Sequence, residues 1–410
     1  GQPGTKTISV TANGGGGISV TAINPGVSSV TTLAGTGTRG YGGDGGSATE
    51  AALNYPHGIA LGTDGSLYIS DSSSNRIRRI GPDGVINTYA GNGQYGGYGD
   101  GGQATQAMLA APRGIALAPD GALYVADTGN HKVRKIPPNG IITTFAGDGQ
   151  VGDLGDGWLA TQARLKAPSA LAVGPDGSLY IVDAESSRIR RVAPDGFIST
   201  VAGNGQYGFT GDGGPATSAS LAHPYGIAVA MDGSLIVADS DNVRVRRVTP
   251  DGKIDTIAGN GEYGFSGDGG PAKQAMIGWV SSLVVASDGT IYFSDDFSRI
   301  RKISKDGIIT TVAGTGVSAF DGDGKSPIET QLNQPQGLVL TPTGIIFSDT
   351  SNHRVRRFEL NKPGKVFGQR TKGFQVNNHT SSTLKKVEAD FNGDGMLDAT
   401  TEDASELLYY

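Results

Sequence analysis

Two stretches of the chain share one pattern: residues 126–136 read ADTGNHKVRKI, and residues 348–358 read SDTSNHRVRRF. The aspartate near the start of this phrase follows a short apolar run, and the combination occurs six times. The six aspartates are Asp71, Asp127, Asp183, Asp239, Asp295 and Asp349. They are 56 residues apart, except for a last interval of 54 residues. A fixed period of this size indicates six copies of one structural unit.

Each unit has the pattern of four short strands. In the first unit the β-prone runs are residues 58–61, 67–69, 76–80 and 86–89. The turns between them carry Asp-Gly, as at Asp64-Gly65 and Asp83-Gly84, and this pair is a strong hairpin signal because glycine accepts the positive φ of the turn. Four antiparallel strands in about 50 residues form one propeller blade. The sequence therefore predicts an all-β, six-bladed β-propeller.

The quoted phrases resemble the core of NHL repeats, and the resemblance covers roughly residues 28–358. The intervening segments, of the form AGNGxxGxxGDGGxAxxAxL, are similar to the long-loop NHL repeats of bacterial surface proteins and of teneurin and Rhs-type propellers. This resemblance implies a binding or structural propeller.

A count of the outer strands predicts how the ring closes. The outer-strand phrase ending in Ala-Gly follows units one to five but not unit six, and it appears ahead of unit one at residues 30–35. The simplest interpretation is that this N-terminal strand completes blade six, which removes an exposed sheet edge. The alternative is that residues 365–367 complete that blade. The predicted organisation is an N-terminal β extension (1–27), the propeller (28–360), a linker (361–384) and a C-terminal hairpin (385–410).

Composition limits the classes of function. The chain has 410 residues, 67 glycines, no cysteine and a formal net charge of −6. No apolar run approaches the roughly 18 residues that cross a membrane, so we expect no membrane insertion. Residues 1–4 lack the features of a signal peptide. We expect a mature, secreted chain that is extracellular or at the cell surface.

Basic residues recur in every unit at two positions of the third strand. The first position holds Arg76, Lys132, Arg188, Arg244, Arg299 and Arg354, and the second holds Arg78, Arg134, Arg190, Arg246, Arg301 and Arg356. One interpretation is a nucleic-acid groove, as in some NHL propellers. The favoured interpretation is a ladder of Asp–Arg pairs and hydrogen bonds between blades, because the chain is acidic and has few aromatic residues for base stacking. We therefore expect no nucleic-acid partner.

An aspartate also recurs in the long loops, often as GDGG. These residues are Asp44, Asp100, Asp156, Asp212, Asp268 and Asp323. Carboxylates in glycine-rich loops suit calcium, but single aspartates in equivalent turns more often bond their own backbone. We expect turn formation here.

One position varies from blade to blade, just before the innermost strand. Its occupants are His57, Arg113, Ser169, Tyr225, Ser281 and Gln336. In a propeller these residues form a ring around one mouth of the central channel, where a protein or glycan ligand would be recognised, although loop tips also vary when nothing constrains them.

The alternative for this ring is a metal-dependent lyase or hydrolase at the channel mouth, as in some NHL-related propellers. Of the five histidines only His57 lies on the ring, with His223 one step away, which is too few for a three-histidine zinc site. The sequence has no nucleophile elbow or P-loop either. We expect no enzymatic activity. Trp158 and Trp279 interrupt the repeat pattern, and we expect them to pack loops against their neighbours rather than to bind a ligand.

Residues 390–398, DFNGDGMLD, predict a calcium site. Oxygens at positions 1, 3, 5 and 9 with glycine at position 6 form a cage for a hard cation, and a backbone carbonyl supplies position 7. The ligands would be Asp390, Asn392, Asp394, Met396 and Asp398. An EF-hand needs a carboxylate at position 12, where Thr401 stands, so the segment instead resembles the calcium hairpin of FG-GAP or VCBS repeats.

The two ends of the chain carry β segments outside the predicted ring. Residues 7–12 and 18–23 alternate like strands, and one C-terminal hairpin is too small for a core of its own. Such segments invite strand pairing with a second copy, which gives filaments unless the assembly closes. The alternative is that both ends pack on their own propeller.

Overall fold

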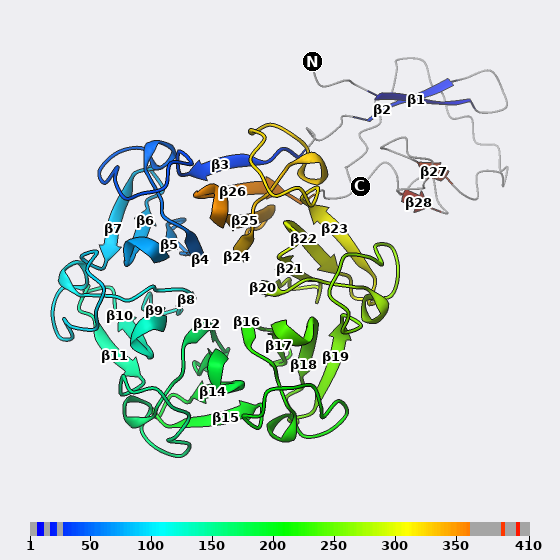
Figure 1. Ribbon diagram of the computed structural model, residues 1–410. Helices are drawn as coiled ribbons and strands as arrows, with labels where there is room; N and C mark the ends of the chain where they lie inside the picture. Colours follow the sequence, from blue (N-terminus) through cyan, green and yellow to red (C-terminus); the bar gives the residue numbers. More distant parts are fainter. Residues whose placement is uncertain (1–5, 12–16, 23–27, 361–386, 390–398, 402–410) are drawn as a thin grey trace, which may run out of the picture. The chain divides into compact units, whose positions relative to one another are not determined.

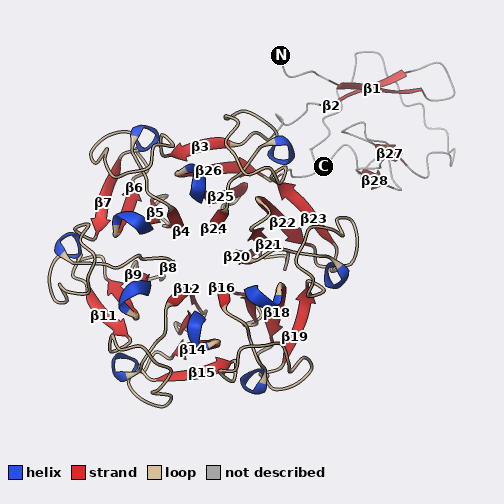
Figure 2. Ribbon diagram, viewed as in Figure 1, coloured by secondary structure: helices blue, strands red, loops and turns tan. Residues whose placement is uncertain are grey.

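The computed structural model describes residues 6–11, 17–22, 28–360, 387–389 and 399–401. Val30–Phe358 is one compact unit made of six four-stranded antiparallel sheets arranged around a common axis (Figure 1). The prediction of an all-β, six-bladed propeller is confirmed. The α-helix is absent from the described residues, and the only helical elements there are single 3₁₀ turns (Figure 2).

Each blade runs from an inner strand beside the axis to an outer strand at the rim. Blades 1 and 2 contain β4 (Pro56–Leu61), β5 (Leu67–Asp71), β6 (Arg76–Ile80), β7 (Ile86–Ala90), and β8 (Ile115–Leu117), β9 (Leu123–Asp127), β10 (Lys132–Ile136), β11 (Thr143–Ala146). Blades 3 and 4 contain β12 (Pro168–Val173), β13 (Leu179–Asp183), β14 (Arg188–Val192), β15 (Ile198–Ala202), and β16 (Pro224–Val229), β17 (Leu235–Asp239), β18 (Arg244–Val248), β19 (Ile254–Ala258). Blades 5 and 6 contain β20 (Val280–Val285), β21 (Ile291–Asp295), β22 (Arg299–Ile303), β23 (Ile309–Ala313), and β24 (Pro335–Leu340), β25 (Gly344–Asp349), β26 (Arg354–Glu359), β3 (Thr31–Ala34).

Short 3₁₀ turns mark two places in the repeat. One set lies in the long loop before each blade: η1 (Ala48–Glu50), η3 (Ala104–Gln106), η5 (Ala160–Gln162), η7 (Ala216–Ser218), η9 (Ala272–Gln274) and η10 (Pro327–Glu329). The other set follows the second strand of every blade except blade 5: η2 (Ser72–Ser74), η4 (Thr128–Asn130), η6 (Ala184–Ser186), η8 (Ser240–Asn242) and η11 (Thr350–Asn352).

The ring is joined at blade 6, where β3 pairs antiparallel with β26. The two strands come from opposite ends of the propeller sequence and lie side by side in Figure 1. Blade 6 also bonds to blade 1, because Ser348 Oγ donates to the His57 carbonyl at 2.7 Å and Thr350 Oγ1 donates to the Pro56 carbonyl at 2.7 Å. Residues 365–367, the alternative closing strand, lie outside the described residues.

The long loops cover the outer edge of each sheet. Before blade 1, the Gly45 amide donates to Ile86 O at 2.9 Å and the Ile86 amide donates to Gly46 O at 3.0 Å. Equivalent pairs of backbone hydrogen bonds join the loops of blades 2 to 5 to Ile142, Ile198, Ile254 and Ile309. An uncovered edge strand would present unpaired backbone groups to other chains, so these loops protect the rim from edge-to-edge association.

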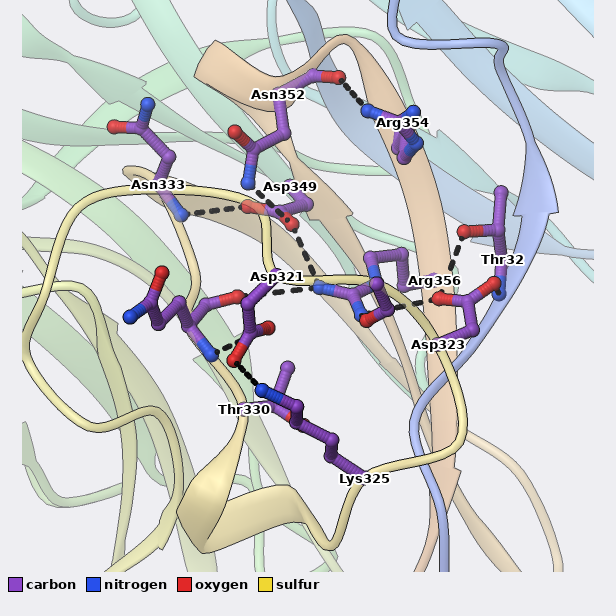
Figure 3. Close-up of polar contacts among 12 residues, drawn as sticks. Thr32, Asp321, Asp323, Lys325, Thr330, Asn333, Asp349, Asn352, Arg354 and Arg356 are labelled. Carbon is purple, nitrogen blue, oxygen red and sulfur yellow. Dashed lines mark hydrogen bonds and ion pairs between the residues drawn. The ribbon is translucent and has the colours of Figure 1, made fainter.

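A buried arginine at the second basic position anchors each loop. All six of these arginines are fully buried. In blade 2, Arg134 Nη2 lies 2.6 Å from Asp100 of the loop and Nη1 lies 3.1 Å from Asp127 at the end of β9. Thr144 Oγ1 of the outer strand donates to the same Asp100 carboxylate at 2.6 Å. Figure 3 shows the corresponding network of blade 6 around Arg356.

This geometry corrects two expectations from the sequence. The Asp–Arg pairs lie within a blade and its own loop. Hydroxyl groups and backbone amides make the hydrogen bonds between blades, as from Thr128 Oγ1 to Pro168 O at 2.7 Å and from the Gly114 amide to Ser169 O at 2.9 Å. The loop aspartates do not act mainly on their own backbone, because a buried guanidinium needs a carboxylate partner more strongly than a turn does. Full burial also prevents these six arginines from contacting a nucleic acid.

The first basic position is covered by an aromatic ring in four blades. The guanidinium carbons of Arg76, Arg244, Arg299 and Arg354 lie 3.6–3.8 Å from the ring centroids of Tyr41, Phe209, Phe265 and Phe320. Blade 2 has Gly97 at the ring position, with Lys132 in place of the arginine. Blade 3 has Asp153 there, and it forms an ion pair with Arg188.

The buried aspartates at the end of the second strand have two kinds of environment. In blades 2, 4 and 6 an asparagine amide donates to the inner carboxylate oxygen at 2.8–2.9 Å and also donates to a carbonyl of the long loop; these residues are Asn130, Asn242 and Asn352. Blades 1 and 3 have serine there, at Ser74 and Ser186, whereas blade 5 is one residue shorter and has Phe297, whose carbonyl accepts from Arg299 as that of Ser74 accepts from Arg76. In those three blades the Oδ2 atoms of Asp71, Asp183 and Asp295 have no hydrogen-bond partner among the described residues.

Burial raises the pKa of all six aspartates, to about 6 for Asp71 and Asp183 and to about 7 for Asp295. An unsatisfied buried oxygen costs free energy that a single added donor can recover.

Two segments lie outside this unit and are described only by their own pairing. β1 (Lys6–Thr11) pairs antiparallel with β2 (Gly17–Ala22), and β27 (Val387–Ala389) pairs antiparallel with β28 (Ala399–Thr401).

We predict that Ser74→Asn stabilises the propeller by about 1 kcal/mol, because the new amide would donate to Asp71 Oδ2 as Asn130 does to Asp127. The reverse change, Asn130→Ser, should lower the free energy of unfolding by a similar amount. Chemical denaturation measures both. Ser73→Asn, at the exposed neighbouring position, is the control and should have no effect. A destabilised Ser74→Asn protein would contradict this account.

Candidate functional site

The six variable residues lie where the inner strands begin, as the sequence analysis expected for a channel mouth. Five of them are the second residue of their inner strand, and Arg113 lies two residues before β8. In the five blades other than blade 2, the pairing of the first two strands is irregular at this point, as between Pro56 and Ile59. A β-bulge changes the direction in which side chains project, which separates these residues from the regular alternation of the strand.

Glycine follows the mouth residue in four blades and allows the backbones to approach closely around the axis. A Cβ atom on Gly58 would lie 2.4 Å from the Arg113 carbonyl oxygen, and one on Gly337 would lie 2.2 Å from the His57 carbonyl oxygen. These distances are too short for any side chain. The frame of the mouth is therefore rigid, while its side chains differ.

Three of the predicted mouth residues meet across the axis. His57 Nε2 of blade 1 lies 3.2 Å from the Tyr225 hydroxyl of blade 4, and their ring centroids are 5.8 Å apart. The guanidinium of Arg113 lies 5.4 Å from the Tyr225 ring centroid, within range for a cation–π contact. Gln336 lies close enough to His57 to influence its pKa, and its Oε1 is a buried acceptor without a hydrogen-bond partner among the described residues. These four side chains form a polar cluster that narrows the mouth.

The two serines of the ring differ from this cluster. Ser169 is only 2% exposed, and its hydroxyl donates to the Tyr225 carbonyl at 3.0 Å. It therefore holds the backbone of a mouth residue and is not accessible to a ligand. Ser281 is half-buried and lines a neighbouring cavity.

Burial and the charge of Arg113 favour the uncharged form of His57, and burial favours the uncharged form of Tyr225. Burial lowers the pKa of His57 to about 3; the positive charge of Arg113 also lowers it, and Gln336 opposes the shift. Burial raises the pKa of Tyr225, which Arg113 partly offsets. At neutral pH the mouth therefore presents an uncharged imidazole, an uncharged phenol and the Arg113 guanidinium.

Below the mouth the channel is apolar. A cavity of about 350 Å³ is lined by the inner strands of all six blades, with small and aliphatic residues such as Gly114, Ala170, Ile227 and Leu338. A polar ligand has few partners there, so recognition is concentrated at the mouth.

Beside the mouth lies a second cavity of about 580 Å³, which we call the hollow. Blades 4, 5 and 6 supply its walls. They include Tyr207, His223, Tyr225, Asp241, Trp279, Ser281, Asp296, Gln334 and Gln336. Three of these nine residues belong to the predicted ring, so the ring opens into the hollow on one side.

Sequence reasoning missed most of the hollow. Tyr207, Asp241, Asp296 and Gln334 stand at positions where the repeat varies, and that variation was the available signal. Trp279 was expected to pack a loop against its neighbour. Its ring centroid lies 5.7 Å from that of Tyr263, yet the residue is 53% exposed and lines the hollow. Trp158 is 52% exposed and belongs to the long loop before blade 3.

The predicted calcium ligands, from Asp390 to Asp398, lie outside the described residues. The strands that flank them, β27 and β28, pair with each other. Within the described residues no group of three His, Cys, Asp or Glu side chains is arranged to hold a metal ion. No helix among the described residues is long and apolar enough to cross a membrane.

Several curated proteins are similar in sequence to this chain. Protein SUPPRESSOR OF QUENCHING 1, chloroplastic, of Arabidopsis thaliana is 30% identical over 355 residues, covering 82% of this chain and 33% of the relative. Teneurin-3 of Danio rerio is 33% identical over 303 residues, covering 63% of this chain and 11% of the relative. The chain thus spans between a tenth and a third of the length of these curated relatives.

Solved structures share the fold. A structural genomics protein of unknown function from Bacteroides thetaiotaomicron superposes with a TM-score of 0.61 at 20% identity, covering 88% of this chain and 82% of the other. Four consecutive and overlapping matches to the family model described as Teneurin NHL domain cover residues 27–97, 92–153, 150–210 and 206–266. These matches extend over more than half of the chain, and the resemblance to NHL repeats is confirmed. The chain belongs to the Teneurin NHL domain family.

Proposed function

We propose that this chain is a non-catalytic binding module of a secreted or cell-surface protein, and that its ligand is held at the mouth and the adjoining hollow. The observation that carries the proposal is that the backbone around the mouth is the same in most blades, whereas the side chains at the mouth differ. Close backbone contacts and buried networks repeat from blade to blade, whereas the six mouth residues differ and four of them cluster. A varied, polar and partly buried set of side chains on a rigid frame is suited to recognition.

The chemistry of the mouth supports binding rather than catalysis. A general base works best with a pKa near the operating pH, and burial holds the pKa of His57 at about 3. The mouth also lacks a carboxylate, since its residues are His, Arg, Ser, Tyr and Gln. A metal-dependent lyase or hydrolase would need more ligands than His57 supplies here.

The first test is ligand binding by the whole chain, labelled and applied to arrays of peptides and of glycans. We expect a signal that falls at least tenfold in a Tyr225→Ala/Gln336→Ala variant, because both residues line the mouth and the hollow. Met231→Ser, in the turn that follows β16 at its other end, is the control and should bind normally. Tyr225→Phe removes only the hydroxyl that contacts His57 and keeps the ring, so it tests the loss of that contact without the loss of packing that Tyr225→Ala causes.

A signal retained in the double variant would place the ligand surface elsewhere. A turnover that a chelator abolishes and that His57→Ala also loses would favour the lyase or hydrolase alternative.

The second test concerns His57. Because burial and Arg113 disfavour its charged form, we expect the imidazole to stay neutral down to about pH 4, as measured by NMR titration. Arg113→Ala should raise the pKa of His57, and Arg164→Ala, on a distant loop, should leave it unchanged. A His57 that titrates near pH 6.5 would contradict the buried cluster.

We further propose that residues 390–398 bind one calcium ion through Asp390, Asn392, Asp394, Met396 and Asp398. The support is the spacing of oxygen-bearing residues with a glycine at position 6, between strands that pair. Isothermal titration of the chelator-treated chain with CaCl₂ should give one site that Asp394→Asn weakens at least tenfold. Asp195→Asn, in an exposed propeller turn, is the control. Equal binding by both variants would refute the assignment.

Assembly into filaments through the terminal strands stays a prediction. β1 pairs with β2 and β27 pairs with β28, and among the described residues no further strand pairs with either two-stranded sheet.

A further inference from the structure

A pairing of an aromatic ring with a carboxylate occurs in both blade 4 and blade 5, and Tyr207, Asp241 and Asp296 of these pairs line the hollow. In blade 4 the Tyr207 hydroxyl donates to Asp241 Oδ2 at 3.0 Å. In blade 5 the Tyr263 hydroxyl donates to Asp296, and Tyr263 also packs against Trp279. Both tyrosines come from the long loop, and both aspartates come from the segment after the second strand. The repeat therefore places an aromatic ring and a carboxylate side by side twice, in adjacent blades.

The other four blades lack this arrangement at the same positions. The loop residue there is Arg39, Tyr95, Val151 or Ser318, as equivalent backbone bridges establish. The residues in place of Asp241 are Ser73, Gly129, Glu185 and Ser351. No other blade combines an aromatic residue with an acid, so the feature is a local property of blades 4 and 5 and not a requirement of the fold.

Neither carboxylate has an arginine or lysine partner among the described residues. Most charged aspartates of the propeller pair with arginine, as Asp232 does with Arg247. Among the described residues Asp241 has only the His223 ring, 3.6 Å away, and Asp296 has no ion pair. No lysine or arginine lines the hollow. The hydrogen bond to Asp241 raises the pKa of Tyr207, and burial together with Asp296 raises the pKa of Tyr263 to about 12.

Exposed aromatic faces accompany these charges. Tyr207 is 70% exposed, and Trp279 and Tyr263 are each 53% exposed. Tyr225 already has the Arg113 guanidinium over its ring, which shows that a cation fits an aromatic face in this region. A cation between aromatic rings and carboxylates gains from both the ring quadrupole and the Coulomb attraction.

We propose that the hollow binds an arginine or lysine side chain of a protein partner. This inference rests on the proposed function and specifies the chemistry of its ligand. Tyr207 and Trp279 supply the aromatic faces, while Asp241 and Asp296 supply the charge. A neutral glycan is the less suited occupant, because the tyrosine hydroxyls are committed to the carboxylates and two partnerless negative charges contribute little to an uncharged sugar.

The chain offers a direct reporter for the test. It has two tryptophans, so Trp158→Phe leaves Trp279 as the single tryptophan, at the wall of the hollow. The probe is an acetylated, amidated Gly-Arg-Gly-Arg-Gly peptide, and the matched probe contains citrulline in place of arginine, which keeps the shape and removes the charge. We expect the arginine peptide to change Trp279 fluorescence, with at least tenfold weaker binding for the citrulline peptide and weaker binding as salt is raised.

Variants assign the effect to the two carboxylates. Asp241→Asn keeps an oxygen that can accept from the Tyr207 hydroxyl. Asp296→Asn keeps an oxygen for the Trp279 backbone amide, which donates to Asp296 Oδ1 at 2.8 Å. The walls of the hollow are therefore preserved in both variants. Each should weaken the arginine peptide about tenfold. Glu185→Gln, the equivalent acid of blade 3, is the control and should bind like the parent.

Other outcomes separate this inference from the proposed function. Equal binding of the arginine and citrulline peptides, or a response to neutral oligosaccharides alone, would overturn the cationic ligand and leave a binding site at the hollow. No change in Trp279 fluorescence with any of these probes, together with no signal on the arrays, would overturn both.

Discussion

A guanidinium without contact with water needs carboxylates and carbonyls around it, because its charge is costly to bury alone. The propeller meets this requirement six times, at Arg78 and its five equivalents. Each arginine contacts the carboxylate of its long loop, and in blades 1, 2 and 6 it also joins the end of the second strand and, through the loop carboxylate, the outer strand. The position of each loop follows from that contact, and so does the covering of each sheet edge.

Once the loops are held in this way, the positions on them can vary without loss of the fold. Different parts of the repeat are therefore under different structural constraints. Residues around the guanidinium change little between blades, whereas the residues that face the axis and the hollow change freely. This division explains why a single face carries both the mouth cluster and the aromatic and acidic pairs.

Much of the architecture was predictable because repetition is visible in the sequence. The spacing of six aspartates and the Asp-Gly turns predicted the blade number and the strand order, and the displaced outer-strand phrase predicted the role of residues 31–34. The partner of each buried arginine was not predictable, since Asp44 and Arg78 are joined only after the loop folds back over the blade. The sequence also named the mouth residues without indicating that His57 and Tyr225 meet from opposite blades.

The hollow was harder to foresee for a related reason. Its residues come from three blades and more than one loop type, and a bulge at the start of each inner strand redirects the side chains there. Periodicity identifies equivalent positions, but it does not say which neighbours those positions face across a ring. The calcium ligands proposed within residues 390–398 rest on a local sequence pattern alone.

The pairing of β3 with β26 has a mechanical consequence. The strands are antiparallel, with Thr31 opposite Arg357 and Ala34 opposite Val355, so the start of β3 and the end of β26 lie at the same end of the pair. Tension applied through the segments that flank the propeller therefore enters at that one end and peels the two strands apart bond by bond, rather than shearing all their hydrogen bonds at once. Blade 6 is therefore expected to unfold first under tension, and the other five blades bear the force only after β3 and β26 have separated.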